Sequence, residues 1–174
     1  NTNGSDSAML DNTLEFFVMN GMPLPLAVMI TIPEPWSNNK AMEQEKKDFY
    51  QYYATMMEPW DGPASILFSD GDIMGAVLDR NGLRPSRYYI TNDGYLILSS
   101  EVGALPIDES RIKVKDRLHP GKMLLVDTVK GELIDDDKLK EQYATKQPYG
   151  EWLDNNLINL CDLNDGVIIE TRLF

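Results

Sequence analysis

The chain has 174 residues, a hydrophobic fraction of 43% and a formal net charge of −12. This length and apolar content fit one compact domain with a substantial core. A surface this acidic repels phosphate backbones and anionic lipid, so nucleic acid and membranes are not expected partners.

The chain start and the cysteine content bear on completeness and compartment. Cys161 is the single cysteine, which excludes a disulfide within the chain and favours a reducing, cytoplasmic location. Residues 1–7, N-T-N-G-S-D-S, lack the basic and apolar segments of a signal peptide, and no apolar run is long enough to span a bilayer. Because there is no initiating methionine, we expect a piece of a longer protein.

Residues 5–20 predict the first helix. Its apolar residues at helical spacing are Leu10, Leu14 and Phe17. Ser5 or Ser7 can cap its start, and Gly21 can end it. Residues 23–32 follow and are apolar throughout, so a helix and a buried strand both remain open there.

Residues 39–57 predict another helix, which begins after Pro33 and Pro35 have interrupted the chain. The residues that would form its buried face are Met42, Phe49, Tyr53 and Met56. No regular element continues through M-E-P-W-D-G-P-A, residues 57–64.

From Ala64 the spacing of apolar residues changes to that of strands. The predicted strands are 65–68, 73–78, 87–91, 95–100, 122–127 and 132–134, with a half-exposed strand in 111–122. Asn92-Asp93-Gly94 is a strong hairpin signal, because its residues tolerate positive φ. Helices follow at 137–146 and 149–160, and the apolar residues of the second are Trp152, Leu153, Leu157 and Leu160. Helices, then antiparallel strands, then helices indicate an α+β fold.

A metal site and an internal nucleophile both find little support. His119 is the only histidine, it is far from Cys161 in sequence, and no Cys/His cluster has ligand spacing. Cys161 has apolar neighbours and no nearby base, so we expect a buried, inert thiol. Residues 135–137, D-D-D, are expected to form a solvated turn and helix start.

Two polar positions allow alternative interpretations. The stretch 79–85, D-R-N-G-L-R-P, predicts a turn between strands, in which Gly82 permits the bend and Pro85 fixes φ. Arg84 there could bind an anion or satisfy loop carbonyls. Asp6, between two serines at a helix start, could interact with the helix dipole or hold the ammonium group of an amino-acid ligand.

Longer segments resemble a known family. These segments are G-S-D-S-A-M-L-D-N, the run from F-Y-Q-Y-Y through M-E-P-W-D-G-P-A to F-S-D-G, L-D-R-N-G-L-R-P-S-R-Y-Y-I-T, S-S-E-V-G-A-L-P-I, L-H-P-G-K-M-L-L-V-D and W-L-D-N-N-L-I-N-L. Together they resemble the class II glutamine amidotransferase domain in the large subunit of the glutamate synthases. They cover nearly the whole chain.

The resemblance implies part of a four-layer αββα sandwich with antiparallel sheets, similar to the N-terminal nucleophile hydrolases. Residues 1–162 would be the C-terminal part of that domain, and 163–174 a tail or the start of a linker. In the family, an N-terminal cysteine attacks the side-chain amide of glutamine, with its own α-amino group as base. The released ammonia then converts 2-oxoglutarate to 2-iminoglutarate, which a reduced flavin reduces to glutamate.

This sequence departs from the family pattern at its start. It begins with Asn1, and the family's nucleophilic cysteine, glutamine-binding arginine and oxyanion-hole residues all precede the matching region. We therefore assign no catalytic residue and no metal ligand here, and expect no glutamine hydrolysis by this chain alone. Asp6, in S-D-S, matches the family's aspartate that binds the α-amino group of glutamine, so the resemblance favours a substrate-binding role.

The resemblance also implies cofactors and partners. FMN, an iron–sulfur cluster and NADPH, NADH or ferredoxin are implied for the longer enzyme, with no cofactor held by this piece. Its partners would be glutamine and the remainder of the polypeptide, and exposed sheet edges could drive self-association. Another class II amidotransferase, such as the phosphoribosylamine-forming enzyme, and a noncatalytic binding or scaffold module are the alternatives. Within the family, Trp60 is expected to pack the joint at 57–64.

Overall fold

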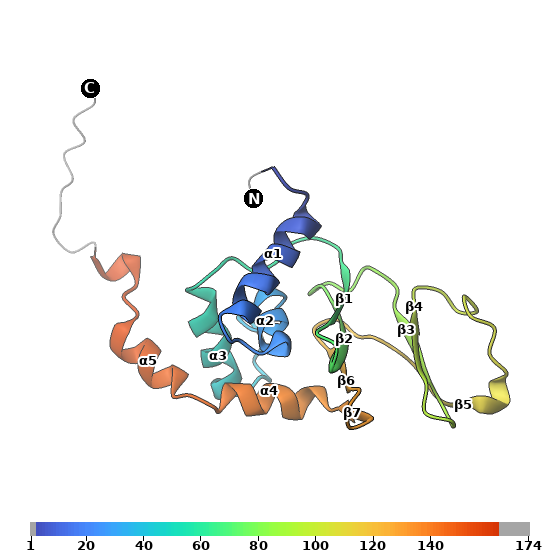
Figure 1. The fold of residues 1–174 in the computed structure, drawn as a ribbon. Helices are drawn as coiled ribbons and strands as arrows, with labels where there is room; N and C mark the ends of the chain where they lie inside the picture. Colours follow the sequence, from blue (N-terminus) through green and yellow to red (C-terminus); the bar gives the residue numbers. More distant parts are fainter. Residues whose placement is uncertain (1–2, 164–174) are drawn as a thin grey trace.

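A computed structural model describes residues 3–163 as three layers (Figure 1). The helical layer contains α1 (Asp6–Met19), α2 (Leu24–Thr31), α3 (Gln44–Ala54), α4 (Asp136–Ala144) and α5 (Tyr149–Asn156). Four strands, β1 (Ser65–Ser69), β2 (Ile73–Leu78), β6 (Met123–Asp127) and β7 (Glu132–Ile134), form one antiparallel sheet in the order β1-β2-β6-β7.

The second antiparallel sheet has the order β4-β3-β5 and contains β3 (Arg87–Thr91), β4 (Leu96–Ser99) and β5 (Ile112–Arg117). Short 3-10 turns lie at Glu109–Arg111 and Leu160–Leu163. The predicted α+β class is confirmed. Of the predicted tail at 163–174, only Leu163 lies within the described residues. No helix in the described range combines the length and apolar character needed to cross a membrane.

The first helix begins and ends as its sequence predicts. The Ser5 hydroxyl accepts a hydrogen bond from the backbone N–H of Ala8, and Gly21 follows the helix with φ +87°. Leu10 and Leu14 are buried against the other helices.

The apolar segment at 23–32, for which sequence left two possibilities, forms α2. All eight residues of α2 are buried. A helix that is apolar on every side is expected to lie inside the protein, and proline at the second helical position loses no intrahelical hydrogen bond. Residues 23–32 show no helical alternation of apolar and polar residues because α2 is buried on all sides, among the other helices and the four-stranded sheet.

Two predicted helices are longer than the helices that the structure shows. The predicted helix 39–57 starts at Gln44 and ends at Ala54, and Met56 is 55% exposed. The helix predicted at 149–160 ends at Asn156, where the Leu157 backbone becomes extended. Leu160 is 80% exposed, so no core contact favours helix there.

The four-stranded sheet is apolar on both faces. Val77, Met123 and Leu125 belong to the core formed with the helices. The alternate residues Ala76, Leu78 and Leu124 form a second core with Leu118, and Tyr88, Leu96 and Leu98 from the other sheet pack against it. The strand period of two therefore places this sheet in the middle layer.

Gly75 of β2 lies directly opposite Phe68 of β1. A Cβ atom at Gly75 would lie 2.2 Å from the Phe68 ring. We expect Gly75→Ala to displace the ring and lower the free energy of unfolding by about 1–3 kcal/mol. Urea titration measures this change. A smaller cost of Gly75→Ala in a Phe68→Leu background would identify the ring as the cause, and equal costs in both backgrounds would contradict it.

Candidate functional site

Asp6 lies in the first turn of α1 and is exposed to solvent. Its carboxylate makes no hydrogen bond or ion pair with any other residue in the range 3–163. Ser5 and Ser7 flank it, with their hydroxyl oxygens 3.1 Å apart. This carboxylate is thus available to an incoming cation.

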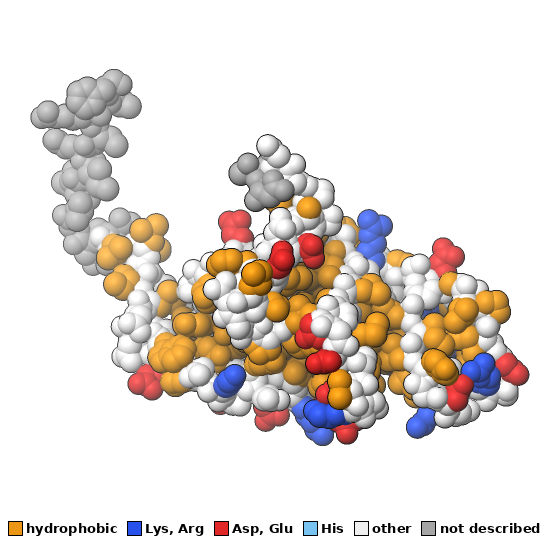
Figure 2. All heavy atoms as spheres, viewed as in Figure 1, with side chains coloured by type: hydrophobic (Ala, Val, Ile, Leu, Met, Phe, Trp, Pro, Cys, Tyr) orange, Lys and Arg blue, Asp and Glu red, His pale blue; other side chains and the backbone are white. Residues whose placement is uncertain are grey.

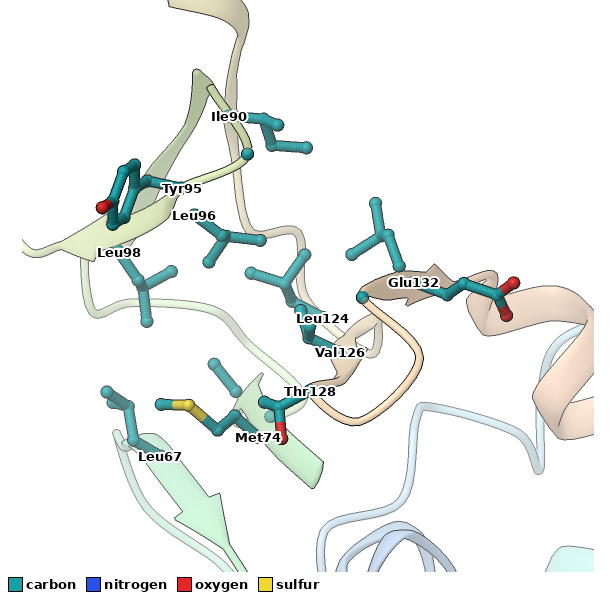
Figure 3. A pocket seen from close by; sticks show the side chains of 15 residues that line it. Leu67, Met74, Ile90, Tyr95, Leu96, Leu98, Leu124, Val126, Thr128 and Glu132 are labelled. Atoms are coloured by element: carbon teal, nitrogen blue, oxygen red, sulfur yellow. The ribbon is translucent and has the colours of Figure 1, made fainter. Parts of the chain in front are cut away.

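A cleft of about 560 Å³ separates the two sheets (Figures 2 and 3). Leu96 and Leu98 point into it from one sheet, and Leu124 points into it from the other (Figure 3). Glu132 is the only carboxylate of its lining, and Asp6 does not line it. An apolar lining without converging polar groups suits side-chain packing rather than chemistry.

The turn between β2 and β3 is organised by a buried carboxylate. Asp79 is 2% exposed, and its two oxygens accept backbone hydrogen bonds from Ala64 at 3.1 Å, Asn81 at 2.9 Å and Gly82 at 3.2 Å. The predicted turn is confirmed, with Gly82 at φ +61°. Asp79 was not recognised from sequence, although an Asp three residues before Gly is a common turn signal.

The joint at 57–64 is fixed to both neighbouring layers. Trp60 packs against the main core, donates from its backbone N–H to the Thr31 carbonyl at 2.7 Å, and donates from its indole to the Gly62 carbonyl at 3.0 Å. Asp61 pairs with Arg80 at 2.9 Å. The expected packing role of Trp60 is confirmed, and the two unusual stretches 57–64 and 79–85 bind each other.

A buried ion cluster connects the helical layer to the middle sheet. The Lys140 ammonium is 3.1 Å from a Glu34 oxygen and 3.0 Å from an Asp136 oxygen, and it donates to the Gly121 carbonyl. Lys140 is only 4% exposed. Tyr50 donates to Glu34 at 3.0 Å. Burial, followed by the charge of Glu34, raises the pKa of Tyr50 well above its usual value.

The D-D-D segment is only partly as predicted. Asp135 caps α4 by accepting from the backbone N–H of Lys138 at 2.9 Å, so the helix start is confirmed. Asp137 pairs with Lys122, and this hydrogen bond lowers the pKa of Asp137. Asp136, by contrast, is not a solvated turn residue, because its carboxylate contacts Lys140 and accepts from the Met123 N–H at 2.8 Å.

The remaining candidates form no catalytic group. Cys161 is exposed, so the predicted burial is wrong; it lies in the short 3-10 turn beyond α5, where Leu160 is also uncovered. His119 lies in a turn closed by a hydrogen bond from the Lys122 N–H to its carbonyl. The Arg84 guanidinium donates no hydrogen bond to a loop carbonyl within residues 3–163. No group of three potential metal ligands occurs in this range.

Comparison with known proteins identifies relatives. Residues 1–152 match the family model described as glutamine amidotransferases class-II. Glutamate synthase [NADPH] large chain of Bacillus subtilis is 51% identical over 160 residues, which are 92% of this chain and 10% of that protein. Glutamate synthase [NADH] of Schizosaccharomyces pombe is 49% identical over 98% of this chain and 8% of its own length. Ferredoxin-dependent glutamate synthase 2, chloroplastic, of Arabidopsis thaliana is 45% identical over 98% of this chain and 11% of its own length. The chain spans about a tenth of the length of these curated relatives.

Proposed function

Because the chain belongs to the class II glutamine amidotransferase family, we propose that it is part of a glutamate synthase. The longer enzyme would hydrolyse glutamine to glutamate and ammonia and transfer the ammonia to 2-oxoglutarate. The observation that carries this proposal is identity of 45–51% to three glutamate synthases over at least 92% of this chain. The fold supports it with the antiparallel two-sheet arrangement expected of this domain.

We assign the substrate-binding role to Asp6. Its exposed carboxylate would accept charge-assisted hydrogen bonds from the α-ammonium of glutamine. This contact orients the substrate and leaves proton transfer to other groups, because the carbon under attack is in the side-chain amide at the other end of glutamine. The nucleophile and the oxyanion-stabilising donors would come from outside these 174 residues.

The cofactors implied for a glutamate synthase do not fit the residues of this chain. An iron–sulfur cluster needs several cysteine thiolates, and Cys161 is the only cysteine. No glycine-rich phosphate loop is present for a flavin nucleotide. These groups would be held by the remainder of the polypeptide. The three relatives are named for NADPH, NADH and ferredoxin, and the longer enzyme would use one of these as its electron donor.

Two further expectations remain predictions. A cytoplasmic location rests on the single cysteine, and the relatives include a protein named as chloroplastic. Self-association of the isolated chain would use the edge strands β1, β7, β4 and β5, whose outer backbone groups lack a neighbouring strand in the described sheets.

The test of the proposed function replaces Asp6 with asparagine in the longer enzyme. We expect the KM for glutamine to rise about 10- to 100-fold, because one charged hydrogen-bonding partner of the ammonium is lost. Glutamate formation from added ammonia should not change, because ammonia bypasses the glutamine site. Steady-state rates with each nitrogen donor measure both effects.

Asp11→Asn is the matched control, because Asp11 is an exposed aspartate on the same helix. It should leave the KM for glutamine unchanged. An unchanged KM in Asp6→Asn would remove Asp6 from the glutamine site. An equal loss of ammonia-dependent activity would instead indicate a general folding defect.

A further inference from the structure

The three-stranded sheet has a cationic face turned away from the four-stranded sheet. Tyr88 and Ile90 of β3 face the inter-sheet core and cleft, so the alternate residues Arg87 and Tyr89 lie on the opposite face. The register places Arg87 directly opposite Arg117 and Tyr89 opposite Lys115. We call Arg87, Lys115 and Arg117 the basic face.

These cations are poorly neutralised within the chain. Arg87 and Arg117 make no ion pair with any carboxylate in residues 3–163, whereas Arg80 and Arg111 each pair closely with an aspartate. Lys115 reaches Glu109 at 3.4 Å. Like charges directly opposite each other across two strands destabilise a sheet. The chain as a whole carries a net charge of −12, so two unpaired arginines opposite each other are unusual in it. We infer that an anionic partner offsets the repulsion between them.

The basic face is concave and has a fixed floor. A hollow of about 360 Å³ is lined by Arg87, Tyr89, Val102, Lys115, Asp116, Arg117 and His119. Tyr89 is only 7% exposed, and the Lys115 ammonium lies 5.6 Å from the centre of its ring. The pairing of β3 with β5 fixes the backbone positions of Arg87 and Arg117 relative to each other. A partner therefore binds two cations whose separation is largely set in advance.

We propose that a segment of the longer polypeptide outside residues 1–174 covers the basic face and presents carboxylates to Arg87 and Arg117. The inference rests on the proposed function, since it requires the chain to be part of a longer enzyme. The curated relatives provide some nine-tenths of their length for such a segment. The guanidinium fork binds carboxylates in a bidentate manner, and charge complementarity therefore favours an acidic protein segment.

The test uses a water-soluble carbodiimide on the longer enzyme. This reagent joins a lysine amine to a carboxylate in direct contact, forming an amide with loss of water and adding no spacer. We expect Lys115 to be joined to an Asp or Glu outside residues 1–174, identified by peptide mass spectrometry. In the Arg87→Gln/Arg117→Gln variant the yield of this product should fall about tenfold, because the segment loses two charge-assisted contacts.

Lys138→Gln/Lys146→Gln is the matched control, since it removes two exposed positive charges from the helical layer and its following loop. It should leave the Lys115 product unchanged. A longer enzyme in which Lys115 joins only Glu109 or another residue of this chain would overturn the inference and leave the Asp6 proposal intact. If no product outside residues 1–174 forms and added inorganic phosphate suppresses the Lys115–Glu109 product, the basic face is a small-anion site, and the inference is also overturned. A natural protein no longer than 174 residues would overturn both proposals.

Discussion

Replacing Lys140 with methionine is expected to lower the free energy of unfolding by about 3–5 kcal/mol. The buried ammonium lies 3.1 Å from Glu34 and 3.0 Å from Asp136, so its removal leaves two carboxylates without their shared cation. It also removes the donor to the Gly121 carbonyl. Urea titration followed by circular dichroism measures the loss.

Lys138→Met is the control for this prediction, because Lys138 is an exposed lysine on the same helix. It should change the free energy of unfolding by less than about 0.5 kcal/mol. A triple variant, Glu34→Gln/Asp136→Asn/Lys140→Met, removes all three charges and should recover part of the loss. If Lys140→Met were no more harmful than Lys138→Met, the ion cluster would not contribute to stability.

Replacing Phe49 with alanine is expected to cost about 3–5 kcal/mol of unfolding free energy. Phe49 is 1% exposed and belongs to the main core. Its ring centre lies 5.0 Å from those of Tyr50 and Tyr53 and 5.5 Å from that of Tyr149, all in edge-on arrangements. Alanine would leave a cavity between α3 and α5 and remove these aromatic contacts as well.

Phe16→Ala provides the comparison, because Phe16 is 64% exposed on α1. Its cost should stay within about 0.5 kcal/mol. Phe49→Leu should fall between the two alanine variants, since leucine refills part of the space. Similar values for Phe49→Ala and Phe16→Ala in thermal and urea unfolding would contradict the assignment of Phe49 to the core.

The strands were predictable because their signals are local. Asn92-Asp93-Gly94 identified the turn between β3 and β4, and alternating apolar residues identified the strands of the β1-β2 and β3-β4 hairpins. The helix ends were less predictable. Leu157 and Leu160 continue the helical spacing of α5, yet the chain turns extended after Asn156 because no core surface lies beside the next turn.

The polar sites were less predictable, since each depends on partners distant in sequence. In the sequence, Lys140 looks like an ordinary exposed lysine on a helix. Its burial and its ion pair with Glu34 arise only when the fold brings the two residues together. Asp79 acquires its role from Ala64 on a neighbouring strand end. Asp6 could be chosen only through family resemblance, because a lone acid at a helix start has an ordinary explanation in the helix dipole.

The contact between Glu34 and Lys140 has a consequence for how the chain folds. Glu34 immediately follows the central helix α2, whereas Lys140 lies on α4, which follows the last strand. Closing so long a loop carries an entropic cost that only the completed contacts can offset. During synthesis, Glu34 therefore lacks its ion-pair partner until the ribosome has released α4, which carries Lys140. The stability that this ion pair contributes is therefore gained only once the chain has been synthesised as far as α4.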